Sequence, residues 1–169
     1  MSIRPSRKPV RLSHFDYATP AAYFVTVCVA PRHNVFWNDL AVGAATCRPR
    51  EIPLNDVGRL VDDAINQIPL RYPHITVDNY CIMPDHIHMI ITIHPDDNGR
   101  QIAAPTLSTV VGHFKRAVSI KLGHSVWQKS YIERVVRNQR SYDAVWEYID
   151  NNPLKFDYAD DPVCFDDFE

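Results

Sequence analysis

The chain has 169 residues, nearly half of them apolar, and a formal net charge of -2 at neutral pH. This length suits one domain with a full hydrophobic core, and no run approaches the ~20 apolar residues that cross a bilayer. The composition therefore excludes an integral membrane protein and a uniformly basic nucleic-acid binder, and we expect a cytoplasmic protein without membrane contact.

Charge is spread unevenly along the chain. The head, residues 1–19, is basic, and the tail, residues 157–169, is acidic. Between them, residues 113–140 carry seven lysine or arginine residues against the single acid Glu133, a local excess that suits phosphate contacts. A plain solvated surface explains such a run equally well. We expect a basic arm at 1–19, a catalytic domain at 20–156 and an acidic tail at 157–169.

The first predicted elements are a strand and a helix. Residues 22–30, AYFVTVCVA, are rich in β-branched and aromatic residues and lie between two prolines, which indicates a strand. Residues 34–53 are irregular, with room for a short strand pair. Asn55 can cap a helix that runs to Leu70, because apolar residues recur there at helical spacing.

A hairpin and a second helix are predicted next. Residues 75–83 and 86–94 are β-type runs separated only by Pro84 and Asp85, which favours an antiparallel hairpin. Thr106 or Ser108 then opens an amphipathic helix that Gly123 can terminate.

The last predicted elements are a strand at residues 131–136 and a helix that Asn138 caps and that ends before Pro153. The whole succession is strand, helix, strand, strand, helix, strand, helix. It predicts an α+β fold, a ferredoxin-like or RRM-like sandwich with an antiparallel sheet of four to five strands and helices packed on it.

The segment YCIMPDHIHMIITI places two histidines two residues apart in an apolar strand. Because side chains alternate along a strand, His86 and His88 project from one face and bring two nitrogen donors together. Such a pair can bind a divalent ion when a third ligand arrives from elsewhere. Two separately hydrogen-bonded histidines are the alternative, and for an isolated His-x-His they are the commoner case.

The last predicted helix offers a third ligand and a nucleophile. Tyr148 and Asn152 stand at i and i+4, and therefore on one helical face. The Asn152 amide oxygen could complete a site of two histidines and one oxygen, with Tyr148 beside a bound phosphate. A buried tyrosine with a satisfied hydroxyl is an equal alternative, and spacing does not exclude Tyr142 or Tyr131 as the nucleophile.

Several blocks resemble one known family. The runs YFVTVCV, YCIMPDHIHMII, APTLSTVVGHFKRAVS and VWQKSYIERVVRNQRSYDAVWEYIDNNP look like the single-tyrosine transposases of the His-hydrophobic-His (HUH) class, insertion-sequence type, especially the REP-associated tyrosine transposases. The resemblance extends from about Leu12 to Asp160. It implies a ferredoxin-like domain, Mg²⁺ or Mn²⁺ on His86 and His88, Asn152 as third ligand, and Tyr148 as the nucleophile that keeps the 5′ phosphate.

The resemblance also implies a partner, which is single-stranded or hairpin DNA. A basic groove and stacking aromatics are the expected contacts, and the candidates for them are Lys115, Arg116, Lys121, Trp127 and Arg137. A homodimer and a monomer are both compatible with the family. Two other functions stay open: a metal phosphoesterase that uses water as its nucleophile, and a domesticated, non-catalytic DNA- or RNA-binding module.

Overall fold

The computed structural model describes residues 20–31, 33–38, 54–95 and 105–155. The predicted basic arm and acidic tail lie outside the described residues, as does most of the irregular segment before Pro53. The proposed domain limits stay predictions.

Four strands form one antiparallel sheet in the order β2-β3-β1-β4. The elements follow one another as β-α-β-β-α-β with an additional C-terminal helix, which is the ferredoxin-like arrangement that the sequence predicts. The fold prediction is confirmed, with four strands rather than five in the described part of the chain. The bounds are β1 Ala21–Cys28, α1 Asp56–Arg71, β2 Ile75–Ile82, β3 His86–Ile93, α2 Leu107–Leu122, β4 Ile132–Val136 and α3 Gln139–Lys155.

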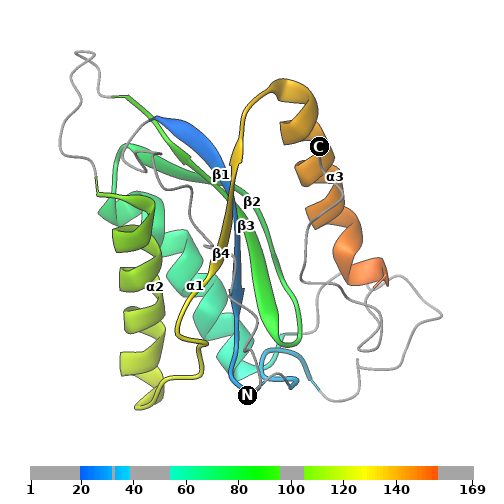
Figure 1. Cartoon of the computed structure of the whole chain (residues 1–169). Helices are drawn as coiled ribbons and strands as arrows, with labels where there is room; N and C mark the ends of the chain where they lie inside the picture. The colour runs from blue at the N-terminus through cyan, green and yellow to red at the C-terminus, as the bar shows by residue number, and fades with distance from the viewer. Residues whose placement is uncertain (1–19, 32, 39–53, 96–104, 156–169) are drawn as a thin grey trace, which may run out of the picture.

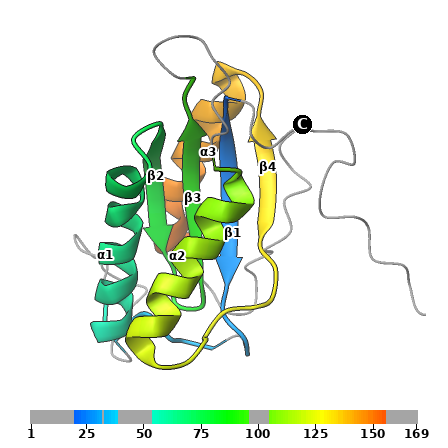
Figure 2. The ribbon, with the colours of Figure 1, turned by 90° about the vertical axis from the view of Figure 1, so that its left-hand side faces the viewer.

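The sheet is covered on both faces. Helices α1 and α2 lie side by side against one face, and α3 lies against the other (Figure 1). In the orthogonal view α1 and α2 stand in front of the sheet and α3 behind it (Figure 2). This arrangement explains why β3 is buried along almost its whole length, whereas a sheet with one solvated face would alternate apolar and polar residues.

The helix starts follow the predicted capping residues. The side chain of Asn55 accepts a hydrogen bond from the Gly58 backbone N–H at 2.9 Å, and Thr106 caps α2 in the same way. Gly123 ends α2 with a φ of 77°, a left-handed conformation that glycine adopts without strain.

The predicted end of the last helix is wrong. Helix α3 continues through Pro153 to Lys155 instead of stopping before the proline. Pro153 lies in the last turn, where the missing amide donor removes one backbone hydrogen bond and leaves the earlier turns intact.

The strand register assigns each side chain of β3 to one layer. Val27 pairs with Ile87 and Val25 with Met89, and these residues form the core beneath α1 and α2. The alternate residues of β3, His86 and His88 among them, therefore face α3. In the described part of the chain, no helix is long and apolar enough to cross a membrane.

Candidate active site

His86 and His88 converge on one point of the α3 face. Their Nε2 atoms lie 3.0 Å apart, and both side chains are completely buried. The two rings meet edge to face, with centroids 4.6 Å apart. The predicted projection of both imidazoles from one face of the strand is therefore confirmed.

The outer nitrogen of each ring has a fixed partner. His86 Nδ1 lies 2.7 Å from a carboxylate oxygen of the buried Asp85, and His88 Nδ1 lies 2.9 Å from the hydroxyl of Thr26. The carboxylate can only accept, so His86 carries a proton on Nδ1. When His88 donates to Thr26 in the same way, both Nε2 lone pairs face each other. Two lone pairs at this distance repel unless a proton or another cation lies between them.

Burial also keeps His88 uncharged. The ring is stacked on Phe24, with centroids 5.4 Å apart. Burial lowers the pKa of His88 well below its usual value, and the neighbouring His86 lowers it further. A neutral imidazole is the form that ligates metal ions, so the surroundings of His88 favour a ligand over an ion-pair partner.

Tyr148 on α3 lies directly against this pair. Its ring centroid is 5.3 Å from that of His88 and 6.0 Å from that of Phe24, both in edge-to-face contacts. The side chain is half-buried, so one side of it remains accessible. The structure thus brings the predicted nucleophile into contact with His88, a predicted metal ligand 60 residues earlier in the chain, and so next to the His86–His88 pair.

The two competing tyrosines are engaged elsewhere. Tyr142 donates its hydroxyl proton to Asp78 at 2.9 Å, and burial together with this acid raises the pKa of Tyr142 to about 12. Tyr131 lies with its hydroxyl 3.1 Å from that of Ser108 on α2, which covers the opposite face of the sheet from α3. Both phenols therefore have hydrogen-bond partners away from the histidine pair.

Asn152 lies one helical turn beyond Tyr148 and is buried. Its amide Nδ2 has no hydrogen-bond partner among the residues that the structure describes, which is costly for a buried polar group. No cluster of three histidine, cysteine, aspartate or glutamate side chains suited to a metal occurs in the described ranges. Among the described residues, a third donor would therefore be of another kind, and an amide oxygen is suitable for Mg²⁺ or Mn²⁺. The donor set of two imidazoles and one amide fits such an ion.

The predicted nucleic-acid contacts do not gather around this site. Lys115, Arg116 and Lys121 belong to α2, on the far face of the sheet from Tyr148 (Figure 2). Lys115 donates to the backbone carbonyls of Gln128 and Ser130 at 2.7 and 3.4 Å, and burial lowers its pKa. It therefore ties the segment before β4 to α2.

Trp127 and Arg137 differ in accessibility. The indole of Trp127 is buried between Phe36 and Phe114 and donates to the Lys115 carbonyl at 3.0 Å. The sequence allows Trp127 either to pack in the core or to stack on a base, and its burial favours packing. Arg137 is exposed between β4 and α3 and remains available to a phosphate.

Two residues of the site were not predicted. Asp85 had been assigned only to the hairpin turn, and Thr26 only to a strand. The signal for Asp85 is the acid directly before the first histidine, in PDHIH. Thr26 could be found only through the register that pairs it with His88.

The comparisons with known proteins identify the family of the chain. The family model described as "Transposase IS200 like" matches residues 46–152, more than half of the chain. The chain therefore belongs to the IS200-like transposase family. A protein of Haemophilus influenzae without an assigned function is 29% identical over 167 residues, covering 88% of each chain. A candidate REP-associated tyrosine transposase of the same organism is 27% identical over 105 residues, which is 57% of this chain and 59% of that protein.

One solved structure has a similar fold. It is a REP-associated tyrosine transposase bound to a REP hairpin, with a TM-score of 0.59 and 20% sequence identity. The similarity covers 86% of this chain and 74% of that one. At this identity the likeness supports the ferredoxin-like fold and does not by itself transfer the DNA partner.

Proposed function

We propose that the protein is a metal-dependent endonuclease and strand transferase that cuts single-stranded, hairpin-bearing DNA through a covalent phosphotyrosine on Tyr148. The observation that carries this proposal is the contact of the Tyr148 ring with His88, whose Nε2 atom meets that of His86. A nucleophile-bearing side chain stands beside two convergent imidazole nitrogens in a transposase-family fold.

His86, His88 and Asn152 would hold Mg²⁺ or Mn²⁺. A divalent ion bound there would supply charge neutralisation for the scissile phosphate. Asp85 and Thr26 would fix the orientation and tautomer of the two rings, as acceptors behind metal-binding histidines commonly do. Phe24 would exclude water from the buried side of His88.

Tyr148 would carry the covalent step. Its phenolic oxygen attacks phosphorus, the bond from phosphorus to the 3′ oxygen breaks, and the phenol proton passes to solvent while the 3′ oxygen gains a proton. The 5′ phosphate stays on Tyr148 as a diester, so attack by another 3′ hydroxyl can rejoin the strands without an external energy source. One site therefore serves both cutting and joining.

Exposed cations would position the DNA. Arg116 and Lys121 on α2 and Arg137 before α3 remain our candidates for phosphate contacts. Arg116 and Lys121 lie on the α2 side of the sheet, and Arg137 directly follows the edge strand β4, so a DNA strand that touches all three has to pass along this edge.

The test uses end-labelled hairpin oligonucleotides with single-stranded flanks, incubated with the protein and Mn²⁺ and separated by denaturing electrophoresis. We expect cleavage and a slowly migrating protein-DNA adduct, both lost in Tyr148→Phe and His88→Ala. His94→Ala is the matched control, because this exposed histidine follows the opposite end of β3.

The outcomes separate the rival functions. Cleavage that persists in Tyr148→Phe without an adduct would identify a phosphoesterase that uses water. Hairpin binding without cleavage under any metal condition would identify a non-catalytic binding module. Either result would overturn the proposed phosphotyrosine chemistry.

A further inference from the structure

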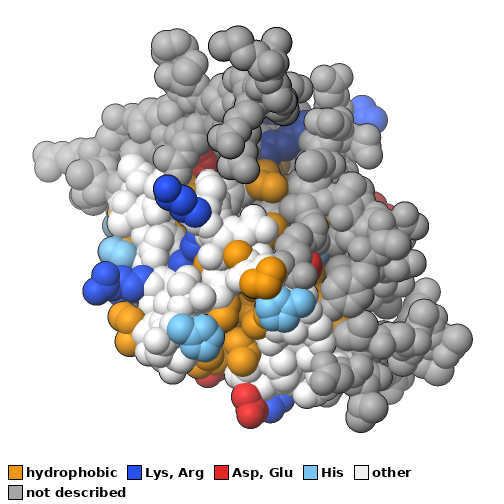
Figure 3. Space-filling model, turned by 60° about the horizontal axis from the view of Figure 1, so that its bottom comes forward, with side chains coloured by type: hydrophobic (Ala, Val, Ile, Leu, Met, Phe, Trp, Pro, Cys, Tyr) orange, Lys and Arg blue, Asp and Glu red, His pale blue; other side chains and the backbone are white. Residues whose placement is uncertain are grey.

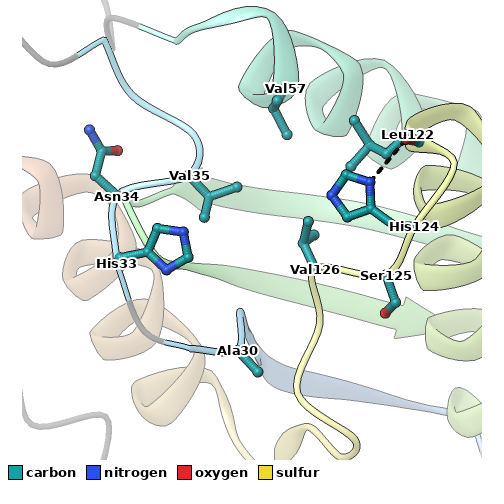
Figure 4. A pocket seen from close by; sticks show the side chains of 9 residues that line it. All are labelled: Ala30, His33, Asn34, Val35, Val57, Leu122, His124, Ser125 and Val126. Carbon is teal, nitrogen blue, oxygen red and sulfur yellow. Dashed lines mark hydrogen bonds between the residues drawn. The ribbon is translucent and has the colours of Figure 1, made fainter.

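A hollow lies at the end of the sheet where β1 ends and β3 begins. This basal pocket encloses about 300 Å³ between the segment after β1, the start of α1 and the segment after α2 (Figure 4). Its apolar wall comes from Val35, Val57, Leu122 and Val126, and its polar rim includes His33 and His124. From the same side, histidine side chains flank exposed hydrophobic atoms (Figure 3).

Backbone carbonyls fix the tautomers of the two rim histidines. His33 Nδ1 lies 2.7 Å from the carbonyl oxygen of Pro31, and His124 Nδ1 lies 3.1 Å from that of Leu122. A carbonyl oxygen only accepts, so each neutral ring carries its proton on Nδ1 and keeps a lone pair on Nε2. The two rings point toward each other from opposite sides of the pocket (Figure 4). The rim thus presents two hydrogen-bond acceptors above an apolar wall.

The pocket is joined to the candidate active site by backbone hydrogen bonds. The N–H of Val35 donates to the Pro84 carbonyl at 2.8 Å, and the N–H of Val29 donates to the Asp85 carbonyl at 3.0 Å. Asp85 is also the residue that holds His86. A ligand in the pocket would therefore sit across the Pro84-Asp85 turn from the histidine pair.

The lining suits an uncharged, flat ligand. No lysine, arginine, aspartate or glutamate belongs to the described lining of the pocket, whose polar side chains are His33, Asn34, His124 and Ser125. Its volume is at the small end of ligand sites, enough for one heterocycle and too small for a hairpin stem. Apolar walls with a few polar groups are the usual receptor for a base turned out of its stack.

We propose that the basal pocket receives one unpaired base of the DNA strand engaged by the active site, and that it prefers cytosine or adenine, whose amino group lies where guanine, thymine and uracil carry a carbonyl oxygen. This proposal rests on the proposed function, because that function supplies single-stranded DNA as the ligand. The amino group of cytosine or adenine can donate to the Nε2 lone pair of His33 or of His124, whereas thymine and uracil present a carbonyl oxygen at the same position.

The test compares labelled oligodeoxycytidylate with oligodeoxyuridylate, which carry an amino group and a carbonyl oxygen, respectively, at C4, and a lone pair and an N–H at the adjacent N3. Affinities are measured by fluorescence anisotropy with Tyr148→Phe protein in EDTA at about pH 8, so that neither cleavage nor metal contributes. We expect the cytosine polymer to bind about fivefold more tightly, the value of roughly one hydrogen bond. The double variant His33→Ala/His124→Ala loses this preference, while His94→Ala keeps it.

A second measurement locates the base. Nitrogen-15 spectra of the histidine rings should show the Nε2 signals of His33 and His124 shifting when oligodeoxycytidylate is added. Because both side chains are exposed, thermal unfolding should show that the double alanine variant keeps its fold. Equal affinity for both polymers, or a preference that survives the double alanine variant, would overturn the proposal. A base preference without any adduct on Tyr148 would refute the proposed function and leave the base-binding proposal standing. An adduct on Tyr148 without a base preference would refute the base-binding proposal and leave the proposed function standing.

Discussion

The Nε2 atoms of His86 and His88 face each other at 3.0 Å, while Asp85 and Thr26 engage the Nδ1 atoms behind them. Each acceptor orients one ring toward the other. The fold thus brings together four side chains from two neighbouring strands and one turn.

The acceptor behind His86 should control metal affinity. In Asp85→Asn the carboxylate charge is lost, so the His86 ring is a weaker and less well-oriented ligand. We expect the affinity for Mn²⁺, measured by isothermal titration calorimetry, to fall about 10-fold to 100-fold. Asp62→Asn is the matched control, because Asp62 is an acid on α1 that accepts from Tyr80. Unchanged affinity in Asp85→Asn would argue against a metal on His86.

Tyr142 should be among the last phenols to ionise. Its pKa is raised to about 12 by burial and by Asp78, above the ordinary value near 10. As the pH rises, the phenol proton of Tyr142 therefore leaves the unfolded chain at a lower pH than the folded chain. The resulting contribution of Tyr142 to folding stability is fully present below about pH 10 and is lost as the pH rises toward 12. Ultraviolet titration of phenolate should lose a high-pH component in Tyr142→Phe. A component lost near pH 10 would contradict the Asp78 contact.

Two glycines should respond to alanine in opposite directions. A Cβ on Gly58 would lie 2.3 Å from the backbone carbonyl oxygen of Phe36, so the start of α1 would have to move. A Cβ on Gly112 would meet nothing within 4 Å. In urea unfolding we expect Gly58→Ala to lose about 1–3 kcal/mol and Gly112→Ala, in the interior of α2, to gain about 0.5–1 kcal/mol. Equal effects at both positions would disagree with this packing.

Trp127 should contribute to folding stability and not to DNA binding. Trp127→Phe removes the hydrogen bond to the Lys115 carbonyl and part of the packing against Phe36 and Phe114. We expect a loss of about 1–3 kcal/mol in unfolding free energy, with hairpin affinity unchanged in an anisotropy titration. A large loss of affinity in a folded variant would restore the stacking role.

Much of the fold follows from local patterns. The alternation in HIHMIITI and the short Pro84-Asp85 connection predict a hairpin with both imidazoles on one face, and the structure confirms this. The caps Asn55 and Thr106 set the helix starts because their side chains satisfy backbone donors that any helix leaves open. The hairpin and the helix starts can therefore be predicted from a few neighbouring residues each.

The remaining features depend on tertiary placement. Thr26 reaches His88 only because β1 pairs with β3 in one particular register. Lys115 and Arg116 look like part of a groove in the sequence, yet α2 covers the face away from Tyr148. Periodicity shows which side of an element is apolar, but it does not show which layer that element joins.

The most direct test of the account is to locate the phosphotyrosine. Protein trapped with a hairpin oligonucleotide and Mn²⁺ is digested with protease and nuclease, and the modified peptide is sequenced by mass spectrometry. We predict a nucleotide on Tyr148 in the wild type and in Tyr142→Phe, and none in Tyr148→Phe. A nucleotide on Tyr142 or Tyr131, or efficient cleavage with no modified tyrosine, would contradict the central claim that Tyr148 acts beside His86 and His88.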